Sequence, residues 1–240
     1  MTTTPPFSVS ARTRWPQRLR GFEVVQRRIE SIQLGLLLAI SDDPQPMVVM
    51  AWQRLIDPLS HGAGVSWSDT RRTPNLVPYQ LADEEVNQWA QWITDVDSRR
   101  VASVEVAIRR TIRAAVERSD PSDALVDAVI AWENLVGSRE GEPTLRVSAA
   151  LAVLLEEEAS LRRARQKVIK DLYALRSDVV HGNRPLGLEE ASKASREARG
   201  IAVDALRKLI RDRPELLEKC SDSGDRSLTL IVGPIAGAQQ

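Results

Sequence analysis

The side chains best suited to chemistry in this sequence are Arg176 and His181, which lie five positions apart in RSDVVHG, residues 176–182. An imidazole titrates near neutral pH and can therefore both accept and donate a proton. A guanidinium stays charged and can contact two phosphate oxygens at once. The pair therefore suits proton transfer beside a bound phosphate, where Arg176 could stabilise negative charge that develops on the phosphate oxygens.

Geometry limits how these two side chains can cooperate. On an ideal helix, five residues correspond to a rotation of about 140° beyond one turn. Arg176 and His181 would therefore share one side only if the helix ends early, which Gly182 would allow. A two-fold partner would bring a second arginine and histidine to the same cleft. A purely structural interpretation also exists, in which both residues offset the negative end of the helix dipole before a terminating glycine.

Other reactive residues carry weaker signals. His61 lies in a glycine-containing segment without Cys or acidic residues at metal-ligand spacing, and Cys220 has no partner motif. Neither a phosphate-binding glycine loop nor a serine nucleophile motif is present in the sequence. The sequence therefore predicts no metal site and no cofactor.

The elements that must position the pair are helices. Apolar residues recur at helical spacing from residue 81 onward, and Asp120-Pro121 is a strong helix start because it combines a capping side chain with a proline at the first helical position. This helix should end at Gly137. Thr144 is expected to cap the next helix, a third should end at Gly182, and a fourth should end before Pro214. Four helices joined by short loops between residues 121 and 213 are enough for a bundle.

The remaining regions are predicted less regularly. Residues 1–20 are expected to be a flexible tail, and residues 21–80 a small α+β region. In that region, residues 34–40 resemble a buried strand, residues 47–59 a short helix, and residues 61–78 a loop. Residues 81–213 form the predicted helical domain, and residues 214–240 a C-terminal tail in which residues 228–232 could add a strand. The predicted fold class is mainly α.

Composition is that of an ordinary globular protein, with 42% hydrophobic and 28% charged residues. Lys plus Arg equals Asp plus Glu at 33 each, so the overall charge does not favour nucleic acid, but residues 160–213 hold 14 basic against 7 acidic residues. Such charges can also simply solvate helix faces. One cysteine, no secretory signal and no long apolar run predict a cytoplasmic protein without a membrane partner.

A resemblance to a known family sharpens these expectations. LYALRSDVVHG, residues 172–182, is similar to the LY-x-x-RS-x-x-x-HG motif of Apea-like HEPN domains, within the R-x(4–6)-H signature of the HEPN superfamily. Residues 124–137 and 146–155 resemble other helices of that group, so the resemblance covers about residues 80–213. It implies a helical bundle that forms homodimers and cleaves RNA without metal, with Arg176 and His181 as the catalytic residues. Ser177 stands where many active members have Asn, Asp or His.

Further residues are candidates for supporting roles. Ser177 or Asp178 could orient His181, Glu133 could pair with Arg176 across the bundle, and Tyr173 is expected mainly to pack. Lys167, Lys170 and Arg184 flank the motif and could hold the RNA backbone, or they could form a solvated face.

The predicted function is a metal-independent endoribonuclease, toxin-like and acting in defence or stress response. Its expected partners are RNA, a second copy of the chain and, as a further candidate, a regulatory protein. One alternative is a non-catalytic HEPN module for RNA or protein binding and dimerisation. Another is an accessory subunit whose function lies in residues 1–80.

Overall fold

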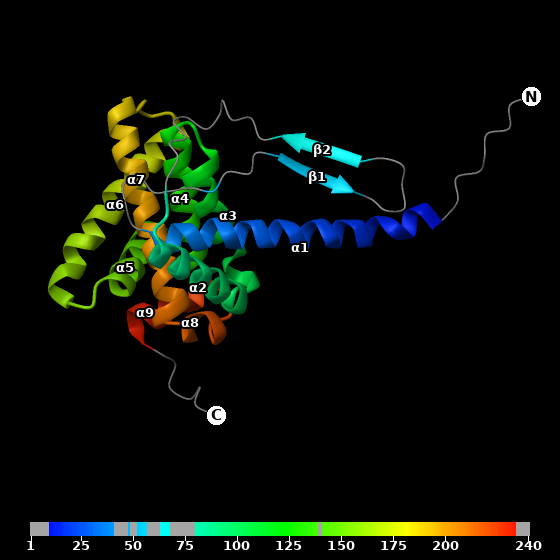
Figure 1. Ribbon diagram of the computed structural model, residues 1–240. Helices are drawn as coiled ribbons and strands as arrows, with labels where there is room; N and C mark the ends of the chain where they lie inside the picture. The colour runs from blue at the N-terminus through cyan, green and yellow to red at the C-terminus, as the bar shows by residue number, and fades with distance from the viewer. Residues whose placement is uncertain are drawn as a thin grey trace, which may run out of the picture.

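The protein is mainly helical in the computed structural model, which describes residues 10–40, 48, 52–56, 63–67, 80–138 and 141–233 (Figure 1). Side chains are described for residues 23–40, 48, 80–138 and 141–233. The α-helices and β-strands are α1 (Ser10–Ala39), β1 (Trp52–Ile56), β2 (Ala63–Trp67), α2 (Asp83–Arg99), α3 (Glu105–Ile112), α4 (Pro121–Val136), α5 (Pro143–Leu155), α6 (Ala159–His181), α7 (Leu188–Arg207), α8 (Glu215–Glu218) and α9 (Ser223–Val232). Three short helical turns join them: η2 (Ala102–Val104), η3 (Arg113–Glu117) and η4 (Lys208–Asp212).

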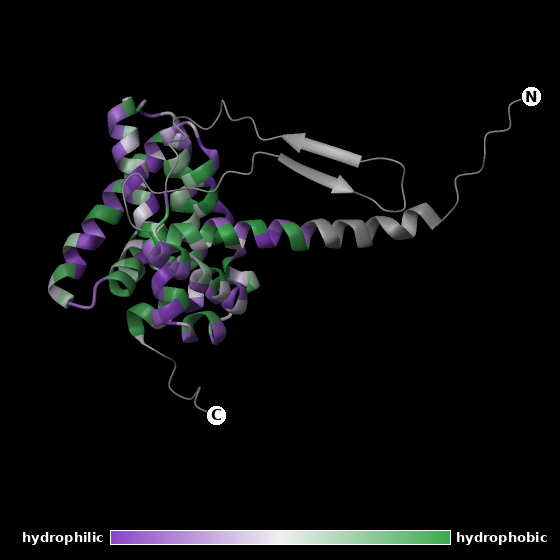
Figure 2. Ribbon diagram, in the orientation of Figure 1, coloured by the Kyte–Doolittle hydropathy of each residue, from purple (hydrophilic) through white to green (hydrophobic). Residues whose placement is uncertain are grey.

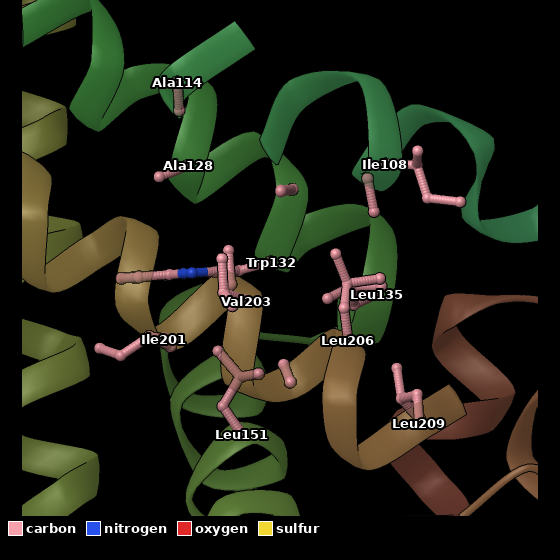
Figure 3. Packing of buried hydrophobic residues seen from close by; sticks show 14 of the residues in the cluster. Ile108, Ala114, Ala128, Trp132, Leu135, Leu151, Ile201, Val203, Leu206 and Leu209 are labelled. Atoms are coloured by element: carbon pink, nitrogen blue, oxygen red, sulfur yellow. The ribbon is translucent and has the colours of Figure 1, made fainter. Parts of the chain in front are cut away.

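Helix α4 is the centre of the bundle, because it packs against α3, α5, α6, α7 and α9. Its sequence is apolar on most sides, as expected for a helix with neighbours all round. Trp132 is fully buried, and its indole Nε1 donates a 3.2 Å hydrogen bond to the Ala198 carbonyl of α7. Leu135, Leu151 and Leu206 belong to the same buried cluster as Trp132 (Figure 3). Burial of these large apolar side chains is the main stabilising contribution to the bundle.

Local signals set the ends of the central helices. The Asp120 carboxylate accepts a hydrogen bond from the Ser122 backbone N–H, Pro121 occupies the first turn, and α4 is followed by Gly137. Helix α6 ends at Gly182, whose φ of 66° is left-handed. These sequence predictions are confirmed. The cap predicted at Thr144 is wrong, since α5 begins at Pro143 after Glu142.

Helix α1 overturns several predictions for the first 80 residues. It is helical from Ser10, so the predicted tail is wrong for residues 10–20. Residues 34–39 of the strand-like run 34–40 form the end of this helix. An apolar run is not specific to strands when a helix is buried on several sides, and α1 packs against α2, α3 and α7. At Gly35 a Cβ atom would lie 2.8 Å from Ile93 Cγ1, so glycine allows α1 and α2 to approach closely.

A two-stranded antiparallel hairpin follows α1. Its register pairs Trp52 with Trp67 and Ile56 with Ala63. Residues 52–56 are therefore a strand instead of the predicted helix, and residues 63–67 are a strand instead of the predicted loop. His61 lies outside the described residues, as do residues 1–9, 41–47, 49–51, 57–62, 68–79, 139–140 and 234–240. The α+β unit predicted for residues 21–80 stays a prediction as a whole.

The C-terminal region is also folded where a tail was predicted. Leu216 and Leu217 of α8 and Leu230 of α9 are buried, and residues 228–232 are helical instead of a strand. Arg226 of α9 is completely buried and donates to the carbonyl oxygens of Leu135 and Asn134. These carbonyls belong to the last turn of α4, which leaves its carbonyl groups without intrahelical partners. Helix α9 therefore closes the end of the central helix.

Hydrophilic and hydrophobic residues alternate along most helices (Figure 2), and the buried hydrophobic residues of these helices form a core cluster. Among the described residues, no helix combines the length and the apolar character needed to cross a membrane.

Candidate functional site

Helix α6 places both residues of the proposed catalytic pair, and it remains helical through His181. The Gly182 and Asn183 backbone N–H groups donate back to the carbonyls of Val179 and Asp178, at 3.3 and 3.0 Å. The early helix end that the sequence allowed is therefore absent. On this continuous helix Arg176 and His181 point about 140° apart, so a single chain does not direct them to the same place.

Arg176 faces inward, toward α4. Its terminal amino group lies 3.7 Å from Glu133 Oε2, and the two side chains are 21% and 33% exposed. The Tyr173 hydroxyl donates a 2.5 Å hydrogen bond to the other oxygen of the same carboxylate, Glu133 Oε1. The guanidinium carbon also lies 5.9 Å from the centre of the Tyr173 ring. The pairing of Glu133 with Arg176 that the sequence suggested is therefore present in the structure.

The electrostatics of this cluster are unusual at Tyr173. Burial, reinforced by the hydrogen bond to Glu133, raises the pKa of Tyr173 to about 12. The hydroxyl thus stays protonated and continues to donate to the carboxylate, which holds Glu133 beside Arg176. The Arg176 Nε is buried without a hydrogen-bond partner among the described residues, so part of the donor capacity of the guanidinium is unused.

His181 lies on the opposite, solvent-exposed side of α6. Counting back along the helix, Lys170, Lys167 and Arg163 fall within about 40° of His181 around the helix axis. All three are exposed, and in the part of the chain that the structure describes none of them forms an ion pair. We call this set the α6 stripe: Arg163, Lys167, Lys170 and His181. It spans about 27 Å along the helix axis at 1.5 Å per residue.

The other predicted supporting residues are not arranged as the sequence suggested. Ser177 and Asp178 are half-buried, and no hydrogen bond joins either of them to His181 among the described residues. The Asp178 carboxylate instead accepts a 3.5 Å contact from the Asn183 amide in the following turn. Arg184 is ion-paired with Glu190, so it is less available to RNA than the lysines of the stripe.

The structure places the α6 stripe and Arg176 on different sides of α6, and the two could do different chemistry. The α6 stripe offers three cations for a phosphate backbone and, at its end, a group that can transfer protons. The contact group of Arg176, Glu133 and Tyr173 offers a guanidinium that is held in place by the Glu133 carboxylate. Sequence reasoning missed Arg163, although its distance of 18 residues from His181 equals five helical turns and could have been recognised.

No family model, no curated protein and no solved structure matches this chain, so these comparisons neither support nor oppose the HEPN interpretation.

Proposed function

We propose that this protein is a metal-independent endoribonuclease of the HEPN type, acting as a homodimer in the cytoplasm in defence or stress response. The observation that carries the proposal is the α6 stripe, in which three exposed cations lead to an exposed histidine at the end of RSDVVHG. A strand of RNA presents phosphates at intervals, and a row of exposed cations is suited to hold them. The charge of the whole chain is zero, so this local concentration matters more than the total.

The chemistry would proceed by attack of the 2′-hydroxyl on the neighbouring phosphate. His181 would remove the hydroxyl proton or supply a proton to the leaving 5′-oxygen, since an imidazole can both accept and donate a proton. Arg176 would stabilise the negative charge of the phosphorane, and loss of one such fixed donor typically costs about 3 kcal/mol of barrier. The products would be a 2′,3′-cyclic phosphate and a free 5′-hydroxyl.

The orientation of His181 and Arg176 requires a second subunit in this proposal. Because His181 and Arg176 point about 140° apart on one helix, His181 of one copy would act with Arg176 of the other. A two-fold interface creates two such pairs automatically. Phosphate would have to replace Glu133 at the guanidinium, and the loose 3.7 Å contact makes this exchange feasible.

The test is RNA cleavage in EDTA by the wild-type protein, His181→Ala and Lys167→Gln/Lys170→Gln. Lys193→Gln serves as the matched control, since Lys193 is exposed on the neighbouring helix α7 and lies outside the stripe. We expect His181→Ala to abolish the cyclic-phosphate product, the double lysine variant to weaken RNA binding, and the control to behave as wild type. Equal cleavage by the wild type and His181→Ala would disprove the assigned role.

A second candidate function is a non-catalytic HEPN module that binds RNA through the same stripe. It is favoured by the engagement of Arg176 with Glu133 and by the inward position of the guanidinium. This candidate predicts that RNA binding depends on Lys167 and Lys170 while the RNA remains intact after prolonged incubation at high protein concentration.

A further inference from the structure

A cleft of about 450 Å³ opens on the bundle at a place that the RSDVVHG motif does not reach. It forms where the end of α5, the first half of α6, the end of α7 and the turn η4 meet α2. Apolar walls come from Trp92 and Leu155, and basic side chains from Arg165, Arg207, Lys208 and Arg211. The volume lies within the range of small-molecule sites, about 300–1,000 Å³.

Charged side chains dominate the lining of the cleft. Asp204 and Asp212 line it together with the four cations, and Glu156, Glu157 and Asp95 pair with three of these cations from beside the cleft. The Asp204 and Asp212 carboxylates are both more than half exposed. Ion pairs at such positions are weak and exchange readily, so a phosphate could replace them.

Two of the cations retain donors for such an anion. Arg165 engages Glu156 through its Nε, and Arg211 engages Asp95 through its Nε, at 2.7 and 2.8 Å. Among the described residues, the terminal amino groups of these two arginines have no hydrogen-bond partner. By contrast, Arg207 uses four of its five N–H donors, three on backbone carbonyls of residues 37–40 and one on Asp204. Arg165 and Arg211 thus retain donors for a ligand. The Lys208 ammonium lies 3.0 Å from the Asp212 carboxylate and 3.4 Å from that of Glu157, and a phosphate could replace these exposed partners.

Arg211 also provides a surface for a planar ring. Its guanidinium carbon lies 3.3 Å from the centre of a Trp92 ring, so one face of the guanidinium is covered by the indole. The Arg211 side chain is 37% exposed and lines the cleft. The face directed away from Trp92 can therefore accept a flat aromatic ring, because guanidinium planes stack well on nucleobases.

We propose that this cleft binds a nucleotide, with its phosphate between Arg165 and Lys208 and its base stacked on Arg211. The site is separate from the proposed catalytic residues. Arg165 lies about 24 Å before His181 along the axis of α6 at 1.5 Å per residue. Binding here does not require ribonuclease activity, so the two proposals can fail independently.

The test is calorimetric titration of the full-length protein with adenosine 5′-monophosphate, adenosine and inorganic phosphate. We expect the monophosphate to bind with a dissociation constant of about 10–100 µM, the range open to a ligand of this size. Adenosine and phosphate should each bind at least about tenfold more weakly, because each makes only part of the contacts. No binding of the monophosphate at millimolar concentration, or equal binding of phosphate alone, overturns the proposal.

Variants test the assignment of the two halves of the site. Arg165→Gln and Lys208→Gln should weaken binding of the monophosphate about tenfold. Arg211→Lys keeps the charge but removes the stacking plane, so it should weaken the monophosphate and leave phosphate binding unchanged. Lys219→Gln is the matched control for Lys208→Gln, since it removes an exposed lysine outside the cleft. Thermal unfolding checks that each variant is folded, and equal losses in Lys219→Gln and Lys208→Gln would overturn the assignment.

A nucleotide unit occurs both free and within an RNA strand, and competition separates the two sources. His181→Ala protein is titrated with the monophosphate in the presence of a short RNA. Displacement of the monophosphate assigns the cleft to a nucleotide of the strand, and simultaneous binding assigns it to a free nucleotide. Binding of the RNA with no binding of the monophosphate contradicts the site.

Discussion

Replacing Glu133 with glutamine tests whether this carboxylate competes with RNA for Arg176. The amide keeps the size of the side chain and an oxygen that can accept from the Tyr173 hydroxyl, but it removes the negative charge opposite the guanidinium. The Arg176–Glu133 contact is 3.7 Å, and both side chains are partly exposed. Solvent screening leaves such a pair worth about 1 kcal/mol. Removing a competitor of this strength corresponds to about a fivefold gain in phosphate affinity.

The assay is fluorescence anisotropy of a labelled RNA, carried out in the His181→Ala background so that the RNA stays intact. We expect Glu133→Gln to lower the dissociation constant about fivefold. Tyr173→Phe is the companion variant: it removes the 2.5 Å hydrogen bond that holds Glu133, so the carboxylate becomes less fixed and the gain in affinity should be smaller. The reasoning is refuted if Glu133→Gln binds RNA as the parent does, or more weakly.

Glu133→Gln should also change the ultraviolet titration of Tyr173. The pKa of Tyr173 is raised to about 12 by burial and then by the hydrogen bond to Glu133. Loss of the carboxylate charge should lower that pKa, while burial keeps it above its ordinary value. The sequence has two tyrosines, so ultraviolet titration in a Tyr79→Phe background isolates Tyr173. An unchanged pKa would show that Glu133 and Tyr173 do not interact in solution.

Three further predictions concern stability. Arg226→Met should lower the free energy of unfolding by about 2–4 kcal/mol in urea denaturation, because buried carbonyls at the end of α4 lose their donor; a loss below about 0.5 kcal/mol would contradict this. Gly137→Ala should destabilise the protein by more than about 2 kcal/mol, since the added Cβ would lie 2.3 Å from the Glu133 carbonyl oxygen. Gly200→Ala on α7 places its Cβ in open space and should stabilise the protein by about 0.5–1 kcal/mol. Similar effects of the two substitutions would refute the packing argument. The raised pKa of Tyr173 contributes to the free energy of unfolding, and this contribution is complete below about pH 10 and is lost as pH rises toward 12. The free energy of unfolding of Tyr173→Phe should therefore fall less steeply over this range than that of the wild type. Parallel curves of unfolding free energy against pH would contradict this contribution.

Local chemistry determined those parts of the fold that the sequence predicted correctly. The Asp120 cap, Pro121 and Gly182 act on their own helix ends through contacts within a few residues, so their effect can be recognised without a tertiary structure. The helical period of the apolar residues likewise identified the bundle from residue 81 onward. Residues 34–40 were misassigned because a run of apolar side chains fits any buried element, and only packing against α2, α3 and α7 makes it a helix.

By itself, the sequence determined the composition of the candidate site, namely RSDVVHG and the basic residues around it. The tertiary structure alone decided how those groups are divided. Because α6 continues through His181, the histidine joins the exposed stripe, while Arg176 turns toward α4 and meets Glu133. The nucleotide cleft depends even more on tertiary structure, since Trp92, Arg165 and Arg211 are far apart in the chain. Contacts between distant segments depend on how helices pack, and helix-local patterns contain no record of that arrangement.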